Sequence, residues 1–204
     1  MITTIGVHKV KQGLIEDGIA DLMGSDKADL IYTDPPWGEG TMKWWQKLNE
    51  KDTGKAPVDI TYDSYMNDMF KILAEYGTGN ICIEYGIKWA DDLIKRAESY
   101  GLVYGATIEL VYRSGSKMAP CHLHLFGNGK APVYPSALLQ DAHHQYGYKL
   151  LQQVFGHLSV PGGIVLDPTC GLGYTAKAAV EFGMKFRGNE MNAKRLEKTK
   201  ARLK

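Results

Sequence analysis

The sequence predicts an α/β protein with a largely parallel sheet covered by helices on both faces. Short β-branched runs alternate along the chain with longer stretches of helical periodicity, which is typical of this fold class. Two of the short runs stop at polar, turn-forming residues, one at Asp34-Pro35-Pro36 and one at Asp167-Pro168. Because two prolines in succession cannot continue a central strand, the first of these runs must end there.

Composition indicates a soluble globular protein of ordinary make-up. The chain has 204 residues, 44% of them hydrophobic and 23% charged, and we expect residues 1–204 to form one domain. No run of about 18 apolar residues and no signal peptide is recognisable, so we expect no membrane partner. The net charge of +1 does not indicate a polyanionic ligand, and three dispersed cysteines fit a reducing compartment.

In the first half of the chain the pattern predicts strands at residues 3–10, 29–33 and 80–84. Helical periodicity is expected at residues 14–23, 62–76 and 89–100. Residues 38–59 show no clear period and are rich in Gly, Lys, Asn and Asp. A connection this long is usually a functional lid or is disordered, so we interpret it as a loop.

In the second half two strands, residues 103–112 and 122–126, are joined by a short link. The link, residues 113–120, favours an antiparallel hairpin. Residues 127–135 are expected to be a loop. Further strands are expected at residues 164–166 and 185–188, and helices at 148–158, 175–181 and 193–204.

A glycine-rich segment, D-P-T-C-G-L-G-Y-T at residues 167–175, lies between a predicted strand and a predicted helix. Gly171 and Gly173 allow a tight turn and close approach of a ligand to the backbone. Glu190 follows Asp167 by 23 residues, at the end of the next strand, where a carboxylate can accept both ribose hydroxyls. The segment has G-x-G but not G-x-G-x-x-G, which favours an adenosyl cofactor without phosphates. S-adenosyl-L-methionine is the candidate.

The second motif, Asp34-Pro35-Pro36-Trp37, suits chemistry on an exocyclic amine. Such an amine is a poor nucleophile because its lone pair is delocalised into the ring. A carboxylate and a rigidly held carbonyl can take its two N–H hydrogens, and the Trp face can hold a base extruded from a duplex. Attack on a sulfonium methyl then depends on positioning and fixed dipoles.

Together the two motifs resemble the amino-methyltransferases of DNA and RNA, and their order resembles the permuted, β-type members. This resemblance implies a Rossmann-like seven-stranded methyltransferase fold and a flipped-base mechanism. It assigns catalysis to Asp34, Pro35, Pro36 and Trp37. The nearest match to the family's remaining cofactor segment is residues 143–149. The implied cofactor residues are Asp167, Thr169, Cys170, Gly171, Gly173, Thr175, Glu190, Asn192, His143 and Lys149.

The resemblance favours adenine N6 in DNA as the target, since Asp in first position is more typical of adenine enzymes. RNA adenine-N6 methylation, DNA cytosine-N4 methylation and a non-catalytic nucleic-acid-binding subunit remain alternatives. Expected nucleic-acid contacts combine basic and aromatic residues of the long loop and hairpin tip. These are Lys43, Trp44, Trp45, Arg113 and Lys117.

No separate target-recognition domain fits between the hairpin and the glycine-rich segment. Residues 127–143 are too few for a core of their own, so specificity is expected to be low or to come from a partner subunit or homodimer. The histidines lack Cys-x-x-Cys or His-Glu-x-x-His spacing, and no metal site is predicted. The expected location is the cytoplasm of a prokaryotic or phage-infected cell.

Overall fold

The computed structural model describes residues 1–54, 59–114 and 116–204, and eight strands within them form one mixed sheet. In spatial order the strands are β1-β2-β8-β7-β3-β4-β6-β5. The stretch from β2 to β4 in this order is parallel, whereas β1, β6 and β5 pair antiparallel to their neighbours. The strands are β1 (Ile2–Ile5), β2 (His8–Gln12), β3 (Ala28–Thr33), β4 (Gly77–Tyr85), β5 (Leu102–Ser114), β6 (Lys117–Asn128), β7 (Ile164–Asp167) and β8 (Lys185–Glu190).

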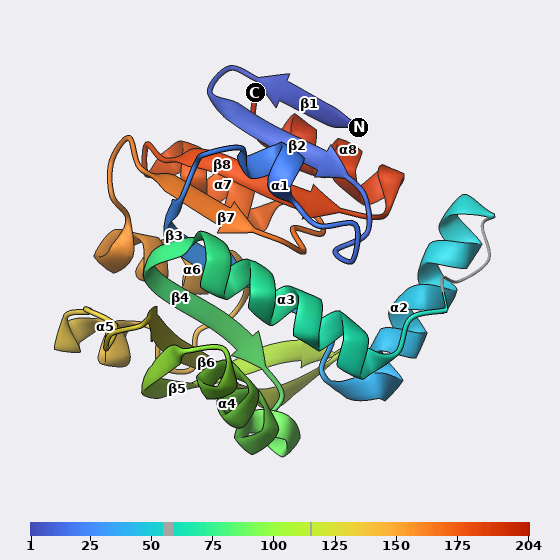
Figure 1. Ribbon diagram of the computed structural model, residues 1–204. Coiled ribbons are helices and arrows are strands. Elements are labelled where there is room, and N and C mark those ends of the chain that lie inside the picture. Colours follow the sequence, from blue (N-terminus) through green and yellow to red (C-terminus); the bar gives the residue numbers. More distant parts are fainter. Residues whose placement is uncertain (55–58, 115) are drawn as a thin grey trace.

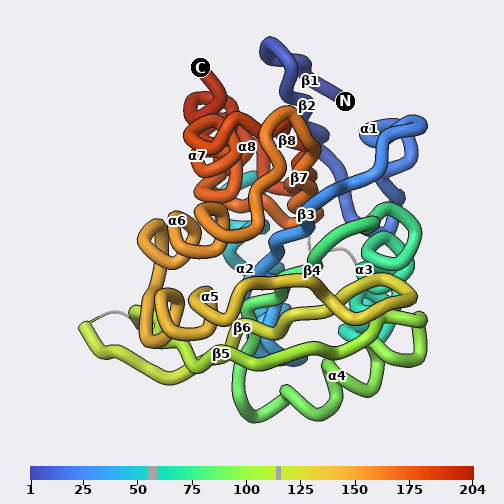
Figure 2. Tube along the Cα trace, turned by 90° about the vertical axis from the view of Figure 1, so that its left-hand side faces the viewer, coloured from blue at the N-terminus to red at the C-terminus, as the bar shows by residue number. Residues whose placement is uncertain are grey.

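Helices cover both faces of the sheet, and the two views show the resulting three layers (Figures 1 and 2). One face carries α1 (Ala20–Met23), α3 (Tyr62–Tyr76) and α4 (Ala90–Ser99), which follows the short 3-10 helix η1 (Ile87–Trp89). The other face carries α5 (Ser136–Asp141), α6 (Gly147–Leu158), α7 (Tyr174–Glu181) and α8 (Ala193–Ala201). The remaining helix, α2 (Gly38–Thr53), stands at the side of the molecule (Figure 1).

Each face of the sheet has its own apolar core. Met66, Phe70 and Leu73 of α3 recur at helical spacing, and all three are fully buried. Thr61 caps the same helix by accepting a hydrogen bond from the Ser64 amide at 3.1 Å. The pattern therefore predicted this helix to the residue, and the α/β class, the largely parallel sheet and the antiparallel hairpin are also confirmed.

At the N-terminus the prediction of one strand over residues 3–10 is wrong, because the chain turns at Gly6. Gly6 has φ +56°, and β1 folds back on β2 as an eighth, edge strand. The helix expected over residues 14–23 is shortened to α1. Lys11, 7% exposed, donates a hydrogen bond to the Gly18 carbonyl at 2.7 Å and thereby holds the preceding residues in a turn.

The connection expected to be a loop is largely helical, since α2 occupies Gly38–Thr53. Residues 55–58 of that expected loop, and Gly115 of the hairpin tip, lie outside the described residues. Met42, Trp45 and Asn49 follow a helical spacing, but the polar residues between them make this period hard to recognise in the sequence. The expected link of residues 113–120 is also mostly strand, with Arg113 opposite Met118. Within the described part of the chain, no helix is both long and apolar enough to cross a membrane.

The sheet has a topological switch point between β3 and β7. These two strands are parallel neighbours, but the chain leaves β3 towards β4 on one side and β7 towards β8 on the other. The connections therefore diverge and leave a crevice at the carboxyl ends of the two strands. Both motifs singled out in the sequence begin where β3 and β7 end.

Candidate functional site

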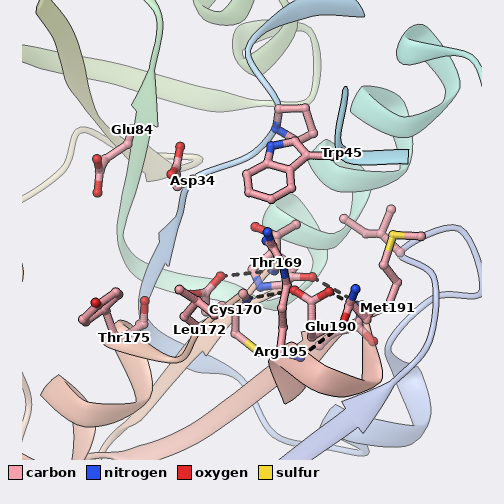
Figure 3. Close-up of a pocket in the computed structure, with 18 of the residues that line it drawn as sticks. Asp34, Trp45, Glu84, Thr169, Cys170, Leu172, Thr175, Glu190, Met191 and Arg195 are labelled. Atoms are coloured by element: carbon pink, nitrogen blue, oxygen red, sulfur yellow. Dashed lines mark hydrogen bonds between the residues drawn. The ribbon is translucent and has the colours of Figure 1, made fainter. Parts of the chain in front are cut away.

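A cavity of about 650 Å³ lies at this switch point and is lined by residues of both motifs. Thr33, the last residue of β3, and Thr169, just beyond β7, are hydrogen-bonded through their hydroxyl groups at 2.8 Å. We call the two parts of the cavity the β8 side (Thr169–Leu172, Glu190–Asn192 and Arg195) and the β3 side (Asp34, Pro36, Trp37, Glu84 and Tyr112). Figure 3 shows the two sides facing one space.

On the β8 side the glycine-rich segment is a tight turn packed against α8. Gly173 has φ +79°, and an added Cβ would lie 2.6 Å from the Thr199 Cα. Gly171 has φ +51°, and its carbonyl accepts a hydrogen bond from the Thr199 hydroxyl at 3.0 Å. Both positions therefore require glycine, Gly171 for its backbone conformation and Gly173 for its close packing as well.

Glu190 ends β8 and is held by backbone donors. Its carboxylate accepts hydrogen bonds from the Gly171 amide at 2.9 Å and from the Asn192 amide at 2.7 Å. The side chain is 8% exposed, and burial raises its pKa. Each oxygen keeps a further lone pair, so this carboxylate can accept a pair of ligand hydroxyl groups.

Asp167, at the end of β7, is also buried and belongs to the same turn. It accepts a hydrogen bond from the Thr169 amide at 3.1 Å and another from the Thr175 side chain. Burial, opposed by these hydrogen bonds and reinforced by Glu190 and Glu84, raises the pKa of Asp167 to about 7. The turn is thus built around a carboxyl group that titrates near neutral pH.

The helix α2 closes the β8 side from above. The Trp45 ring lies 3.9 Å from the guanidinium carbon of Arg195, and Asn192 donates a hydrogen bond to Asp52 at 3.1 Å. Figure 3 shows Trp45 directed into the cavity opposite Thr169 and Cys170. This helix therefore forms a wall of the cavity and gives it an aromatic surface.

The residues around the β8 side fit a polar ligand. Four cavity-lining residues each present a buried polar atom without a hydrogen-bond partner among the described residues. These atoms are Glu16 Oε1, Asn49 Oδ1, Tyr65 Oη and Asn189 Oδ1. Since buried polar groups are normally paired, their concentration here indicates a place where a ligand or water completes the hydrogen bonding.

On the β3 side, Asp34 is fixed by the aromatic residue of its own motif. The Trp37 indole N–H donates a hydrogen bond to Asp34 Oδ1 at 2.9 Å. Trp37 in turn meets Tyr112 of β5 edge to face, with ring centroids 4.7 Å apart. The backbone turns sharply after Trp37, where Gly38 has φ +79° and no room for a Cβ against Trp89.

Two carboxyl groups occupy the β3 side together. Asp34 is exposed to the cavity, and Glu84 is half-buried. Partial loss of hydration and repulsion by Glu84 together raise the pKa of Asp34 well above its usual range. Burial also raises the pKa of Glu84, although the hydroxyl hydrogen bond from Tyr32 opposes the shift. The β3 side therefore holds two neighbouring carboxyl groups, each of which loses its proton less readily than a free carboxyl group.

The structure brings most of the expected catalytic and cofactor residues together, but not all. Those lining the cavity are Asp34, Pro36, Trp37, Asp167, Thr169, Cys170, Gly171, Thr175, Glu190 and Asn192. Pro35 and Gly173 shape the turns behind it. His143 and Lys149 are not among the lining residues; His143 instead lies 3.5 Å from Glu109 of β5. The neighbouring Tyr146 and Gly147 line the cavity in their place.

The residues expected to contact nucleic acid divide into two groups. Lys43, Trp44 and Lys117 are exposed, and Lys43 pairs with Glu39 on the same helix at 2.7 Å. Trp45 and Arg113 line the cavity, and Arg113 is exposed as well. Trp45 was expected in a loop but belongs to α2, and the helical turn directs it inward, against Arg195.

Sequence reasoning missed Glu84 and Tyr112 as site residues. Glu84 had a recognisable signal, since it is a lone acidic residue at the end of a predicted apolar strand next to the Asp34 strand. Tyr112 had none, because only the hairpin packing brings it to Trp37.

No protein-family model matches the sequence. Solved structures of similar fold include M1.HpyAVI in complex with SAM, with TM-score 0.67, 17% identity and coverage of 95% of this chain and 98% of that chain. TTHA0409 from Thermus thermophilus, complexed with S-adenosyl-L-methionine, has TM-score 0.63, 16% identity and coverage of 96% and 93%. The cytosine-N4-specific PvuII DNA methyltransferase has TM-score 0.68, 13% identity and coverage of 97% and 86%. The chain therefore has the Rossmann-like methyltransferase fold, with eight strands instead of the expected seven.

Proposed function

We propose that this protein is an S-adenosyl-L-methionine-dependent DNA methyltransferase that modifies the exocyclic amine of a base, adenine N6 in particular. The observation that carries the proposal is the junction of two strand ends at one cavity. The Thr33–Thr169 hydrogen bond ties the Asp34 motif to the glycine-rich turn, so that an amine at one can meet a methyl donor at the other. Similar folds in DNA methyltransferases agree with this function.

The β8 side has the residues to hold the adenosyl group. Glu190 would accept the ribose hydroxyls, Trp45 would contact the flat adenine ring, and the turn around Gly171 would approach the ligand through its backbone. The bound cofactor would supply a methyl group on a sulfonium sulfur, which is open to in-line displacement by an amine. Two of the similar structures contain this same cofactor.

On the β3 side Asp34 is the acceptor for the target amine. A carbonyl of the Pro35-Pro36 turn is the second acceptor; that of Pro36, which lines the cavity, also accepts a hydrogen bond from the Gly38 amide at 3.1 Å and keeps a further lone pair. With both N–H hydrogens engaged, the nitrogen lone pair is turned towards the methyl donor. Asp34 then takes the proton that the nitrogen loses, and its raised pKa makes it a stronger base for this step.

Trp37 provides the aromatic surface beside the reacting amine. Its indole N–H keeps Asp34 in place while the edge-to-face contact with Tyr112 fixes the ring. A base flipped out of a duplex can stack on such a ring. Arg113, together with the exposed Lys43, Trp44 and Lys117, would contact the strand that carries the base.

The choice between adenine N6 and cytosine N4 is proposed from Asp34, the first residue of the Asp34-Pro35-Pro36-Trp37 motif. Aspartate in this position favours adenine N6 over cytosine N4, whereas PvuII methyltransferase, a protein of similar fold, is specific for cytosine N4. We further propose that these 204 residues act as one catalytic domain without a target-recognition domain of their own. Sequence specificity would then be low, or a partner subunit or second copy would provide it.

The test is transfer of labelled methyl from S-adenosyl-L-methionine to unmethylated DNA, with the wild type beside Asp34→Ala. Nucleoside mass analysis identifies the product. We expect N6-methyladenine from the wild type and none from the variant. N4-methylcytosine would keep the class of enzyme but change the base, and methylation of single-stranded RNA alone would replace DNA as the substrate. A wild type that fails to bind the cofactor would overturn the proposal.

A further inference from the structure

Glu84 is a carboxylic acid on the β3 side of the cavity that the reaction proposed above does not use. It belongs to β4, which pairs in parallel with β3, and Thr33 is matched with Ile83 in the register. The next residues are Asp34, just beyond the end of β3, and Glu84 of β4, so both side chains start at the same level of the sheet. Figure 3 shows their carboxyl groups in the same part of the cavity.

Glu84 is held in place by buried neighbours. The Tyr32 hydroxyl, on a side chain that is 2% exposed, donates a hydrogen bond to Glu84 Oε1. On the other side of β4 the register places Leu123 of β6 opposite Glu84, and Leu123 is fully buried. The hydrogen bond engages Oε1 and leaves Oε2 for a partner in the cavity that Glu84 lines.

Asp34 and Glu84 are neighbouring carboxyl groups, and the pKa of each is raised. Loss of hydration raises both pKa values, and repulsion by Glu84 adds to the shift of Asp34. Among the described residues, the titratable groups seen to interact with the pair include Tyr32, Cys121 and Asp167, which carry no positive charge, and Arg113 lines the same cavity. Two such carboxyl groups do not both ionise readily near neutral pH. The pair can therefore hold one proton shared between its two carboxyl groups, and can offer a base one O–H donor beside one acceptor.

Adenine and cytosine share an edge that complements this pair. In each base the exocyclic amine, a hydrogen-bond donor, lies beside an unprotonated ring nitrogen, an acceptor: N1 in adenine and N3 in cytosine. We infer that Glu84 is a second base-contacting residue, donating a hydrogen bond to this ring nitrogen while Asp34 accepts one from the amine. The inference rests on the proposed function and adds a specificity-determining residue to it.

The test removes the residue and the ring nitrogen separately and together. Wild type and Glu84→Met are compared on DNA carrying adenine or 1-deazaadenine, in which N1 is a C–H group. For a cytosine enzyme, 3-deazacytosine takes that place. Each single change is expected to lower kcat/KM about 10- to 100-fold, the range for one good base contact. The double change should lose less than about 2-fold more, because both changes remove the same hydrogen bond.

Two further variants keep the result interpretable. Glu84→Gln retains an N–H donor and should keep most of the wild-type preference for adenine over its deaza analogue. Glu98→Ala removes an exposed carboxylate on α4 and should leave kcat/KM unchanged. The affinity for S-adenosyl-L-methionine, measured by calorimetry, should stay within about 2-fold of the wild type in all variants. If Glu84→Met does not fold, Glu84→Ala is used in its place.

The outcomes separate this inference from the proposed function. Losses that multiply, or a wild type that uses adenine and 1-deazaadenine equally well, would overturn the role of Glu84 and leave the methyltransferase proposal intact. Absence of any methylation by the wild type would overturn the proposed function, and the role of Glu84 with it.

Discussion

The carboxyl groups on the two sides of the cavity receive their hydrogen bonds from different kinds of donor. On the β8 side, Glu190 accepts hydrogen bonds from two backbone amides, and Asn192 both caps α8 and bonds Asp52 of α2. On the β3 side, Asp34 and Glu84 each receive one side-chain hydrogen bond and repel one another. Backbone donors cannot move away, so the β8 side is suited to holding a ligand in one position. On the β3 side, Asp34 can still accept a proton from a reacting amine.

This comparison predicts that substitutions on the β8 side act through folding and cofactor affinity. The largest effect is expected for Gly173→Ala, because the new Cβ would lie 2.6 Å from the Thr199 Cα on a backbone with φ +79°. We expect a loss of about 3–5 kcal/mol in unfolding free energy. Gly183→Ala is the matched control, since Gly183 has φ +67° but nothing within 4 Å, and should cost only about 1 kcal/mol. Equal losses in urea denaturation would contradict the packing argument.

The next effect in size concerns the pH dependence of stability. Burial raises the folded-state pKa of Asp167 from 3.8 to about 7. The folded protein therefore binds a proton that the unfolded chain has lost between these values, and the stabilisation it brings is lost as pH rises through about 7. Relative to Asp167→Asn, the wild type should lose on the order of 2–4 kcal/mol between pH 4 and pH 8. Parallel stability curves for the two proteins would refute the shift.

The smallest effect, a change in cofactor affinity, is expected for substitutions in α2, which forms one wall of the cavity. Trp45→Ala removes the ring beside Arg195 and should weaken binding of S-adenosyl-L-methionine about 3- to 10-fold. Trp44→Ala is the control one residue away, because Trp44 is 56% exposed and does not line the cavity. Calorimetric titration measures both. A larger loss from Trp44→Ala would mean that α2 lies differently against the cavity.

The sequence predicted best where local chemistry decides the structure. The Asp-Pro-Pro stop, the Gly171 and Gly173 turn and the strand-end Glu190 are set by backbone conformation and spacing, so they lie where expected. The α3 helix was predicted from a strong apolar period and a Thr61 cap.

The sequence predicted worst where tertiary packing decides it. The residues of α2 that line the cavity are Met42, Trp45, Gln46, Leu48 and Asn49, and this mixture of polar and apolar side chains is too weak a signal to predict a helix. The loose motif match over residues 143–149 implies His143, whereas the turn before α6 brings Tyr146 and Gly147 to the cavity. The pairing of Asp34 with Glu84 depends on the register of β3 with β4, which neither strand alone reveals.

The most direct test of this account is the single-turnover methyl-transfer rate of Glu190→Gln and Asp34→Ala as a function of cofactor concentration. Glu190→Gln should be slow at low S-adenosyl-L-methionine, with affinity reduced about 10- to 100-fold, and should approach the wild-type rate at saturation. Asp34→Ala should bind the cofactor normally and stay at least about 1,000-fold slower at every concentration. Recovery of Asp34→Ala by excess cofactor, or failure of Glu190→Gln to recover, would contradict the division of the cavity into a binding side and a reacting side.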